Sequence, residues 1–327
     1  LMFAGTTRSI PWFVAYVLLM VISGLQSGGG WQEGTLSNTL VVFSFVMNIG
    51  GVSAIVFILL RYFVHAREQA MAALDLEHQR VRHSLSLAME VQQNLLPKTN
   101  PQIDGLDIAG NSIYCDETGG DYYDFLEVGA PGEGKIGVVV GDVSDHGIPS
   151  ALLMATARAL IRQRCSAFGR IDRVVSDVNR QLAKDVKDSG RFMTLFYAEI
   201  ERSNKTIRWV NAGHEPALIF DPVLDTFSDL NGSNNLALGV FEDTDFKGAQ
   251  QEIAAGQIIV IATDGIWEAR NPDGVMFSKD RIHKIIRRNA SKTANDIQNA
   301  IMDSLKRFQK NVKLEDDMTL VVIKITG

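Results

Sequence analysis

The chain has 327 residues, 46% of them hydrophobic, and its 32 basic and 38 acidic side chains give a formal net charge of −6. That length supports one large domain or two ordinary domains with cores of their own. The acidic balance argues against a general nucleic-acid-binding protein. Two cysteines, Cys115 and Cys165, are too few for a disulfide-stapled fold or a four-cysteine zinc site. Residues 1–96 carry equal numbers of basic and acidic side chains, so the whole negative surplus follows residue 96.

Two uncharged apolar stretches lie near the start of the chain, at 10–25 and 39–60. Because a membrane-spanning helix needs about 20 apolar residues, the second stretch is long enough and the first is slightly short. A signal peptide is the alternative for the first stretch, and a buried core helix is the alternative for either. We expect a membrane segment over residues 1–64, with helices near 10–25 and 39–64. Position 1 is Leu and not Met, which leaves a longer N-terminus open.

The distribution of basic residues around these stretches predicts their orientation. The loop at 26–38 has no Lys or Arg, whereas Arg8 precedes the first stretch and Arg61 and Arg67 follow the second. Because basic residues stay on the cytoplasmic side, both ends of the segment should face the cytoplasm. The sequence therefore predicts a multi-pass protein of the cell (inner) membrane, in contact with membrane lipid, whose larger part is cytoplasmic.

Residues 65–96 predict a helical neck, since they contain no Gly or Pro and are rich in helix formers. An alternating spacing of three and four residues links Met71, Leu74, His78, Val81, Leu85, Ala88, Gln92 and Leu95. Such a heptad seam favours a parallel homodimeric coiled coil, in which the polar positions His78 and Gln92 would tune the register. The alternative is a single amphipathic helix that lies on its own domain. Pro97 should end the helix.

Residues 97–327 read as one α+β body. Apolar runs predict strands at 106–113, 135–141, 192–201, 206–211, 217–220, 257–262 and 318–326. Helical periodicity predicts helices at 149–168, 171–187, 279–289 and 293–309. Because several strands follow each other through short turns, antiparallel pairing with added helices is favoured over strict alternation.

An acidic residue beside Gly or another Asp recurs next to these apolar runs. It occurs at Asp121, at Asp142, at Asp264, and at the pair Asp316 and Asp317. Carboxylates that converge at strand ends repel one another unless a cation neutralises them, and hard cations such as Mg²⁺ and Mn²⁺ prefer oxygen ligands. Any single Asp-Gly is more often a turn, so the spacing alone leaves a metal site and a set of turns both open. No phosphate-binding glycine loop, zinc-type helix motif or nucleophile elbow is present.

Taken in chain order, seven stretches resemble the SpoIIE/RsbU branch of the PPM family of metal-dependent serine/threonine protein phosphatases. They are EVQQNLLP at 90–97, DETGGDYYDF at 116–125, GDVSDHGIPSALLM at 141–154, FMTLFY at 192–197, NAGHEP at 211–216, ATDGIWEARN at 262–271 and DDMTLVV at 316–322. The resemblance covers residues 90–326 and leaves out the membrane segments. It implies an αββα fold, an antiparallel β-sandwich flanked by helices, here preceded by the coiled-coil neck and two transmembrane helices.

The resemblance also implies a site with two divalent cations, Mn²⁺ or Mg²⁺. Asp142 would bridge both cations, Asp264 and Asp316 would hold one, and Asp121 with the carbonyl of Val143 would hold the other, partly through water. The catalytic group would be a metal-bound water, with no protein nucleophile.

The resemblance therefore implies a membrane-anchored hydrolase that acts in signal transduction and sigma-factor regulation. Its substrate would be phosphoserine or phosphothreonine on a small cytoplasmic regulator, a STAS-type anti-sigma-factor antagonist. One alternative is a catalytically inactive PPM-like module that only binds partners. Another is a nucleotidyl cyclase or kinase output on a similar neck, although the nucleotide-binding motifs are absent.

Two residues in the matching stretches need separate comment. Asp145 stands where the family usually has Gly, and we expect it to point to solvent, so that Asp145→Gly should keep activity. His214 lies in the NAGHEP stretch, where a structural role in a turn is at least as plausible as general acid catalysis, and we assign it no chemical role.

Overall fold

The computed structural model describes residues 18, 38–129, 135–165, 169–233 and 235–327. The chain divides into two units, Leu1–Glu77 and His78–Gly327. The second unit therefore begins within the predicted neck, before Pro97.

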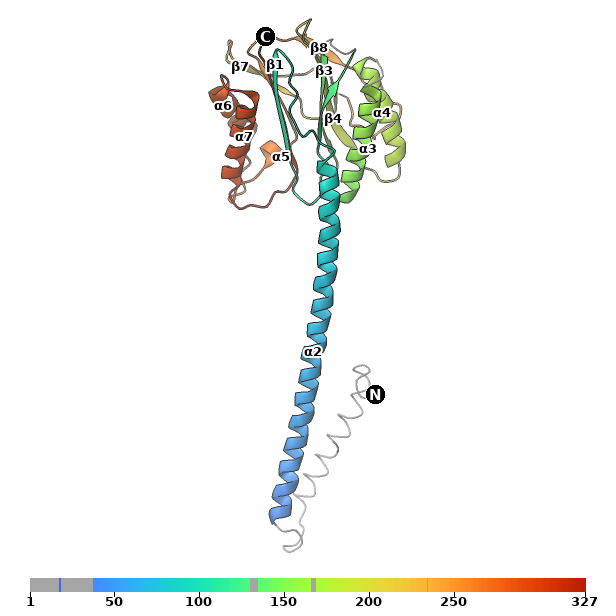
Figure 1. The fold of residues 1–327 in the computed structure, drawn as a ribbon, viewed down its shortest axis with the longest axis vertical. Helices are drawn as coiled ribbons and strands as arrows, with labels where there is room; N and C mark the ends of the chain where they lie inside the picture. The colour runs from blue at the N-terminus through green and yellow to red at the C-terminus, as the bar shows by residue number, and fades with distance from the viewer. Residues whose placement is uncertain (1–17, 19–37, 130–134, 166–168, 234) are drawn as a thin grey trace. The chain divides into compact units, whose positions relative to one another are not determined.

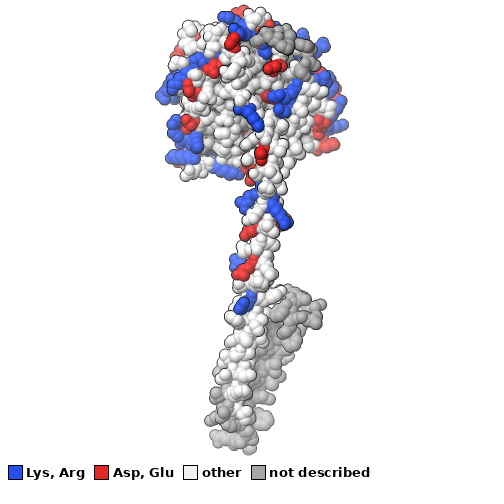
Figure 2. All heavy atoms as spheres, in the orientation of Figure 1, with Lys and Arg blue, Asp and Glu red and all other residues white. Residues whose placement is uncertain are grey.

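Helix α2 (Asn38–Gln93) contains the predicted second membrane span and continues without a break into the predicted neck. Its segment Val46–Gln93 includes an 18-residue window with a mean hydropathy of 1.8 and no buried part, which is long and apolar enough to cross a membrane. Residues 38–60 of α2 contain no Asp, Glu, Lys or Arg, and Figure 2 shows the corresponding end of the helix without red or blue atoms on the visible face. The predicted first span at 10–25 lies outside the described residues, apart from the exposed helical residue Leu18. The described ranges thus hold one candidate span and do not support a multi-pass arrangement.

The end of α2 differs from the predicted coiled-coil neck. The helix ends at Gln93, four residues before Pro97. Gln92, predicted as a polar seam position, is only 5% exposed and is buried against the second unit's own fold. Leu74 and Val81 are both half-exposed or more and remain available to a second copy. The heptad spacing was therefore misread at Gln92, because a helix that docks on its own domain uses the same period as a coiled coil.

Ten strands in the described residues form two five-stranded antiparallel sheets. The first sheet has the order β1 (Leu106–Ile113), β10 (Met318–Ile325), β9 (Ile258–Ala262), β6 (Leu218–Asp221), β7 (Thr226–Asp229). The second has the order β2 (Tyr122–Glu127), β3 (Lys135–Val143), β4 (Met193–Glu201), β5 (Thr206–Ala212), β8 (Ala249–Glu252).

Helices cover the outer face of each sheet, as Figure 1 shows for the second unit. α3 (Ile148–Cys165) and α4 (Ile171–Val186) pack on the sheet that contains β3. α6 (Lys279–Asn289) and α7 (Ala294–Gln309) pack on the sheet that contains β10, and the short α5 (Gly265–Glu268) follows β9. The predicted antiparallel sandwich flanked by helices is confirmed.

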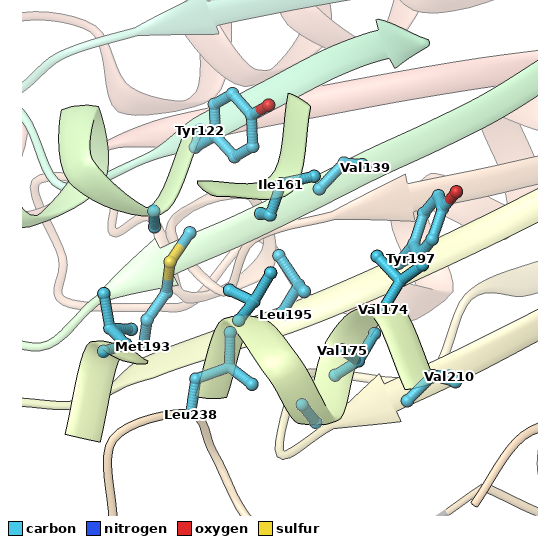
Figure 3. Close-up of a cluster of buried hydrophobic side chains, with 14 of the residues drawn as sticks. Tyr122, Val139, Ile161, Val174, Val175, Met193, Leu195, Tyr197, Val210 and Leu238 are labelled. Carbon is cyan, nitrogen blue, oxygen red and sulfur yellow. The ribbon is translucent and has the colours of Figure 1, made fainter. Parts of the chain in front are cut away.

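Side chains that alternate along the central strands build three apolar layers, one between the two sheets and one under the helices on each side. On β3, Val138 and Val140 enter the core between the two sheets, whereas Val139 and Val143 enter the core under α3 and α4. Figure 3 shows Val139 of this second core close to Ile161 of α3. Successive side chains of a strand point to opposite faces, so a strand covered on both faces must be apolar throughout. Each fully buried aliphatic side chain stabilises the fold by about 1.5–3 kcal/mol.

The sequence predicted the long buried strands and missed the short ones. The predicted strand at 106–113 and the predicted helix at 279–289 match the structure residue for residue. Three strands, β2, β7 and β8, and the helix α5 were not predicted. β7 and β8 are four-residue polar strands without an apolar run, and β2 is interrupted by the buried carboxylate Asp124.

Candidate metal centre

Two of the predicted ligands lie at one end of the second sheet. Asp142 is near the end of β3, and Asp121 directly precedes β2. Because Tyr122 pairs with Gly141 in the antiparallel register, both carboxylates reach the same rim. The carbonyl of Val143 follows on the same strand.

Two further predicted ligands lie at the matching end of the first sheet. Asp264 lies two residues after the end of β9, and Asp316 lies two residues before the start of β10. These strands are antiparallel neighbours, with Ala262 opposite Leu320, so the end of one lies beside the start of the other. Asp264 is half-buried and Asp316 is exposed.

Thr263 joins the two sheets at this rim. Its hydroxyl Oγ1 donates a 2.8 Å hydrogen bond to Oδ2 of Asp121 in the other sheet. The same oxygen accepts a 3.0 Å hydrogen bond from the backbone N–H of Thr319 on β10. This contact joins the residue that precedes Asp264 in the first sheet to Asp121 in the second, so the predicted ligands of both sheets approach one rim.

Electrostatic repulsion among these carboxylates is visible in their pKa values. Burial, followed by the nearby charges of Asp264 and Asp316, raises the pKa of Asp142 to about 8. Burial and the charge of Asp142 hold the pKa of Asp121 well above its usual range. Burial and Asp316 likewise raise the pKa of Asp264. A divalent cation would relieve this repulsion, because it favours the charged form of every carboxylate around it.

The backbone at Gly120 fits close to the Val143 carbonyl. A Cβ atom placed on Gly120 would lie 2.8 Å from the carbonyl oxygen of Val143, closer than real side chains allow. Glycine therefore leaves that oxygen open beside Asp121, as a ligand role for the carbonyl requires.

The donor set suits a hard cation. Four carboxylates and one carbonyl supply oxygen alone, the ligand type of Mg²⁺ and Mn²⁺. Within the described ranges, no group of three or more His, Cys, Asp or Glu side chains is arranged so that it could hold a metal ion. The residue types and their shared rim suit a hard cation, whereas the side-chain positions do not form a coordination shell, so the ligand set stays a prediction.

Asp317 holds the rim together and was not predicted to have a role separate from Asp316. It is only 2% exposed, and its carboxylate accepts backbone hydrogen bonds from Cys115 and Gly120, each of 2.8 Å, and from Asp121 at 3.4 Å. A carboxylate with three N–H donors fixes the loop that carries Asp121 against the start of β10. The doubled Asp in the sequence was the only signal.

Gln92 reaches the same loop from helix α2. Its side-chain Nε2 donates a 2.6 Å hydrogen bond to the carbonyl of Gly119, and its Oε1 accepts a 3.1 Å hydrogen bond from the Gly119 N–H. Gly119 is two residues from Asp121, so the last turn of α2 contacts the backbone of a candidate ligand loop.

His214 lies behind the rim and has a structural environment. It is 7% exposed, and Asn211 bonds both its backbone N–H and its carbonyl at 2.8 Å. Its Nδ1 lies 2.8 Å from the hydroxyl of Thr194, which in turn donates a 3.4 Å hydrogen bond to the carbonyl of Asp142. Burial lowers the pKa of His214 to about 4, so the ring is neutral at physiological pH.

Asp145, the residue that departs from the family pattern, points away from this cluster. Its side chain is 72% exposed and lies 3.8 Å from Arg191. Its backbone φ of 65° is in the left-handed region that favours glycine. The neighbouring His146 pairs with Asp116 at 3.0 Å, which links the second acidic stretch to the first.

Comparison with known proteins places this chain in a family. A family model described as Stage II sporulation protein E (SpoIIE) matches residues 132–326. The phosphoserine phosphatase RsbU of Bacillus subtilis is 31% identical over 246 residues, which cover 75% of this chain and 71% of RsbU. The chain spans 55% and 58% of the two curated relatives that follow.

Solved structures show the same fold. The SiaA-PP2C domain of Pseudomonas aeruginosa superposes with a TM-score of 0.66 at 21% identity, over 76% of this chain and 98% of that domain. RsbX, solved in complex with magnesium, superposes with a TM-score of 0.50 at 15% identity, over 69% of this chain and 98% of RsbX. The two sheets and their flanking helices are thus those of the PP2C, or PPM, phosphatases.

Proposed function

This chain belongs to the SpoIIE family and is a metal-dependent protein serine phosphatase, and we propose that it hydrolyses phosphoserine or phosphothreonine on a small regulatory protein in the cytoplasm. The observation that supports this proposal is the hydrogen bond between Thr263, next to Asp264 in the first sheet, and Asp121 in the second, which brings the predicted ligands of both sheets to one rim.

In the proposed site, two divalent cations, Mn²⁺ or Mg²⁺, would share Asp142 as a ligand. Asp264 and Asp316 would hold one of them, and Asp121 with the Val143 carbonyl would hold the other, partly through water. Bound there, the cations would acidify a water for attack on phosphorus and neutralise charge on the phosphoryl oxygens. Thr263 orients the Asp121 carboxylate by its hydrogen bond, and Asp317 fixes the backbone that carries it.

The protein groups near the rim support a mechanism without a protein nucleophile. Burial and the Asp317 carboxylate raise the pKa of Cys115 to about 12, so its sulfur stays a thiol at neutral pH. The neutral His214 is hydrogen-bonded to Thr194 and holds that hydroxyl near the Asp142 backbone.

The substrate that we propose is a serine-phosphorylated STAS-type protein, an anti-sigma-factor antagonist. The support is the 31% identity to RsbU, which is a phosphoserine phosphatase. Removal of the phosphate would change the protein's binding partner and so regulate transcription.

We further propose that helix α2 anchors the protein in the cell membrane and pairs with a second copy. The apolar window of α2 supports one membrane span, and the exposed Leu74 and Val81 support a homodimer through the neck. Gln92 and Gly119 then connect the neck to the Asp121 loop. The test compares the full chain with residues 78–327: equal oligomeric state and equal phosphatase activity would contradict control by the neck.

The proposed activity is tested by phosphate release from a serine-phosphorylated STAS-domain protein and from 4-nitrophenyl phosphate, with Mn²⁺, with Mg²⁺ and with chelator. Metal-dependent release from both supports the proposal. A folded protein that binds no metal and releases no phosphate would favour the inactive partner-binding module instead.

A further inference from the structure

A buried amide on helix α4 fixes a short turn at the surface of the second unit. Asn179 is fully buried. Its Oδ1 accepts a 2.9 Å hydrogen bond from the N–H of Gly239, and its Nδ2 donates to the carbonyls of Phe241 and Glu242 at 2.8 and 3.2 Å. Because three hydrogen bonds from one buried side chain determine its backbone, this turn is rigid.

The turn is anchored to the core on its other side as well. Leu238 is buried, and its backbone exchanges two hydrogen bonds of 2.8 and 2.9 Å with Met193 on β4. Figure 3 shows Leu238 and Met193 in the same apolar cluster. Gly239 has a φ of 90° and lies against Phe192, so that its backbone turns sharply next to this residue.

This rigid turn presents large apolar side chains to solvent. Phe241 is 64% exposed and Val240 is 42% exposed, and the adjacent Phe192 is 39% exposed. Single exposed apolar residues are normal on protein surfaces. Three of them, on two segments that contact each other, form a patch, and patches of this kind mark sites of interaction.

The patch is linked to the predicted metal rim through Ser144. Phe192 accepts a 3.0 Å hydrogen bond from the N–H of Ser144 through its carbonyl, and its own N–H donates to the Ser144 hydroxyl at 3.2 Å. Ser144 directly follows Val143 and is two residues from Asp142. A phosphoprotein whose phosphoserine reaches the rim would therefore come close to Phe192.

We propose that Phe192, Val240 and Phe241 form the docking surface for the body of the phosphoprotein substrate. This inference rests on the proposed function and names the surface that distinguishes a protein substrate from a small phosphate ester. A phosphoserine side chain alone offers little contact area, whereas an aromatic anchor held in a rigid turn binds without a large loss of conformational freedom.

The charges around the patch describe the partner further. Glu242, Asp243 and Asp245 follow Phe241 and are all exposed. A complementary surface presents an apolar centre with basic side chains beside it, close to its phosphoserine. The occupant that we propose is the folded phosphorylated regulator, since a folded protein can present such a surface beside its phosphoserine.

The test measures kcat/KM of the full chain in detergent on two substrates, a serine-phosphorylated STAS-domain protein and 4-nitrophenyl phosphate. We expect Phe241→Ser to lower the ratio of the two constants, protein over aryl phosphate, by about tenfold or more, through KM for the protein. Phe192→Ser should lower the ratio in the same direction. Leu224→Ser is the matched control, because Leu224 is also exposed, at 70%, and lies in the turn between β6 and β7.

The outcomes separate this inference from the proposed function. If wild type dephosphorylates the STAS-domain protein and the ratio is unchanged in both Phe variants, the docking surface is wrong and the function stands. If wild type hydrolyses only the aryl phosphate, the proposed substrate is wrong, and the proposed docking surface for that substrate is wrong as well. A lowered ratio in both Phe variants, with Leu224→Ser equal to wild type and thermal unfolding unchanged, supports the docking surface.

Discussion

The side-chain amide of Gln92 forms a two-point hydrogen bond with the backbone of Gly119, using its nitrogen as donor and its oxygen as acceptor. Gln92 lies in the last turn of α2, and Gly119 lies in the loop that leads to Asp121. A Cβ atom on Gly119 would collide with Oδ2 of Asp317, so the loop is packed tightly from both sides. Any displacement of the end of α2 is therefore transmitted to the backbone beside a candidate ligand.

We predict that Gln92→Leu weakens binding of Mn²⁺ by about tenfold or more, since residues that position metal ligands typically contribute that much. The change leaves the N–H and carbonyl of Gly119 buried without partners, which costs about 1–3 kcal/mol for each unsatisfied group. Isothermal titration with Mn²⁺ on residues 78–327 measures the affinity. The neighbouring Gln93 is exposed, and Gln93→Leu should bind Mn²⁺ as wild type does. Equal affinities for the two variants would refute the link between α2 and the site.

Asp317 and Asp316 should respond in opposite ways to the same substitution. Asp317→Asn removes a charged acceptor from three backbone N–H groups, and we expect it to lower the free energy of unfolding by about 2–3 kcal/mol. Asp316 is exposed as a whole residue, and partial desolvation of its carboxylate, followed by the charge of Asp317, raises its pKa. Asp316→Asn should therefore leave unfolding in chelator unchanged or more difficult, while it weakens metal binding. Urea denaturation in chelator distinguishes the two, and an equal loss of stability in both would contradict the separate roles.

Asp145→Gly should keep phosphatase activity and increase stability by a few tenths of a kcal/mol to about 1 kcal/mol. Asp145 has a φ of 65°, which costs a non-glycine residue free energy that glycine does not lose. Its exposed carboxylate makes only a loose 3.8 Å pair with Arg191, and surface pairs contribute little. Thermal unfolding and phosphate release measure the two effects. A large loss of rate in a folded variant would instead assign Asp145 a part in the site.

His214 should make stability depend on pH below neutrality. Its pKa is about 4 in the folded protein and about 6.5 when unfolded, so the unfolded chain binds more protons between these values. The contribution of neutral His214 to the free energy of unfolding is fully present above pH 6.5 and is lost as the pH falls toward 4. The loss between pH 7 and pH 5 is about 2 kcal/mol. Urea denaturation in chelator at both pH values should give a steeper loss for wild type than for His214→Asn. Identical pH slopes would contradict a buried neutral His214.

Most strands of the sandwich could be predicted from the sequence, because buried strands appear as short continuous apolar runs. The valines before Asp142 and the isoleucines before Asp264 form continuous apolar runs, the pattern of strands covered on both faces, and their acidic ends follow directly. The sequence could not show which of Asp316 and Asp317 is buried. Neighbouring residues at a strand end point in opposite directions, so either could be the buried one. Gln92 was assigned to a coiled coil for a similar reason, because helical periodicity does not identify the surface that a helix contacts.

The central claim is that carboxylates from both sheets form one metal centre that releases phosphate. The most direct measurement is Mn²⁺-dependent hydrolysis of 4-nitrophenyl phosphate by residues 78–327, compared with Asp142→Asn of the second sheet and Asp264→Asn of the first. We predict that each variant stays folded and loses at least about a hundredfold in rate together with metal affinity. If either folded variant keeps the wild-type rate and Mn²⁺ affinity, the two sheets do not share the site.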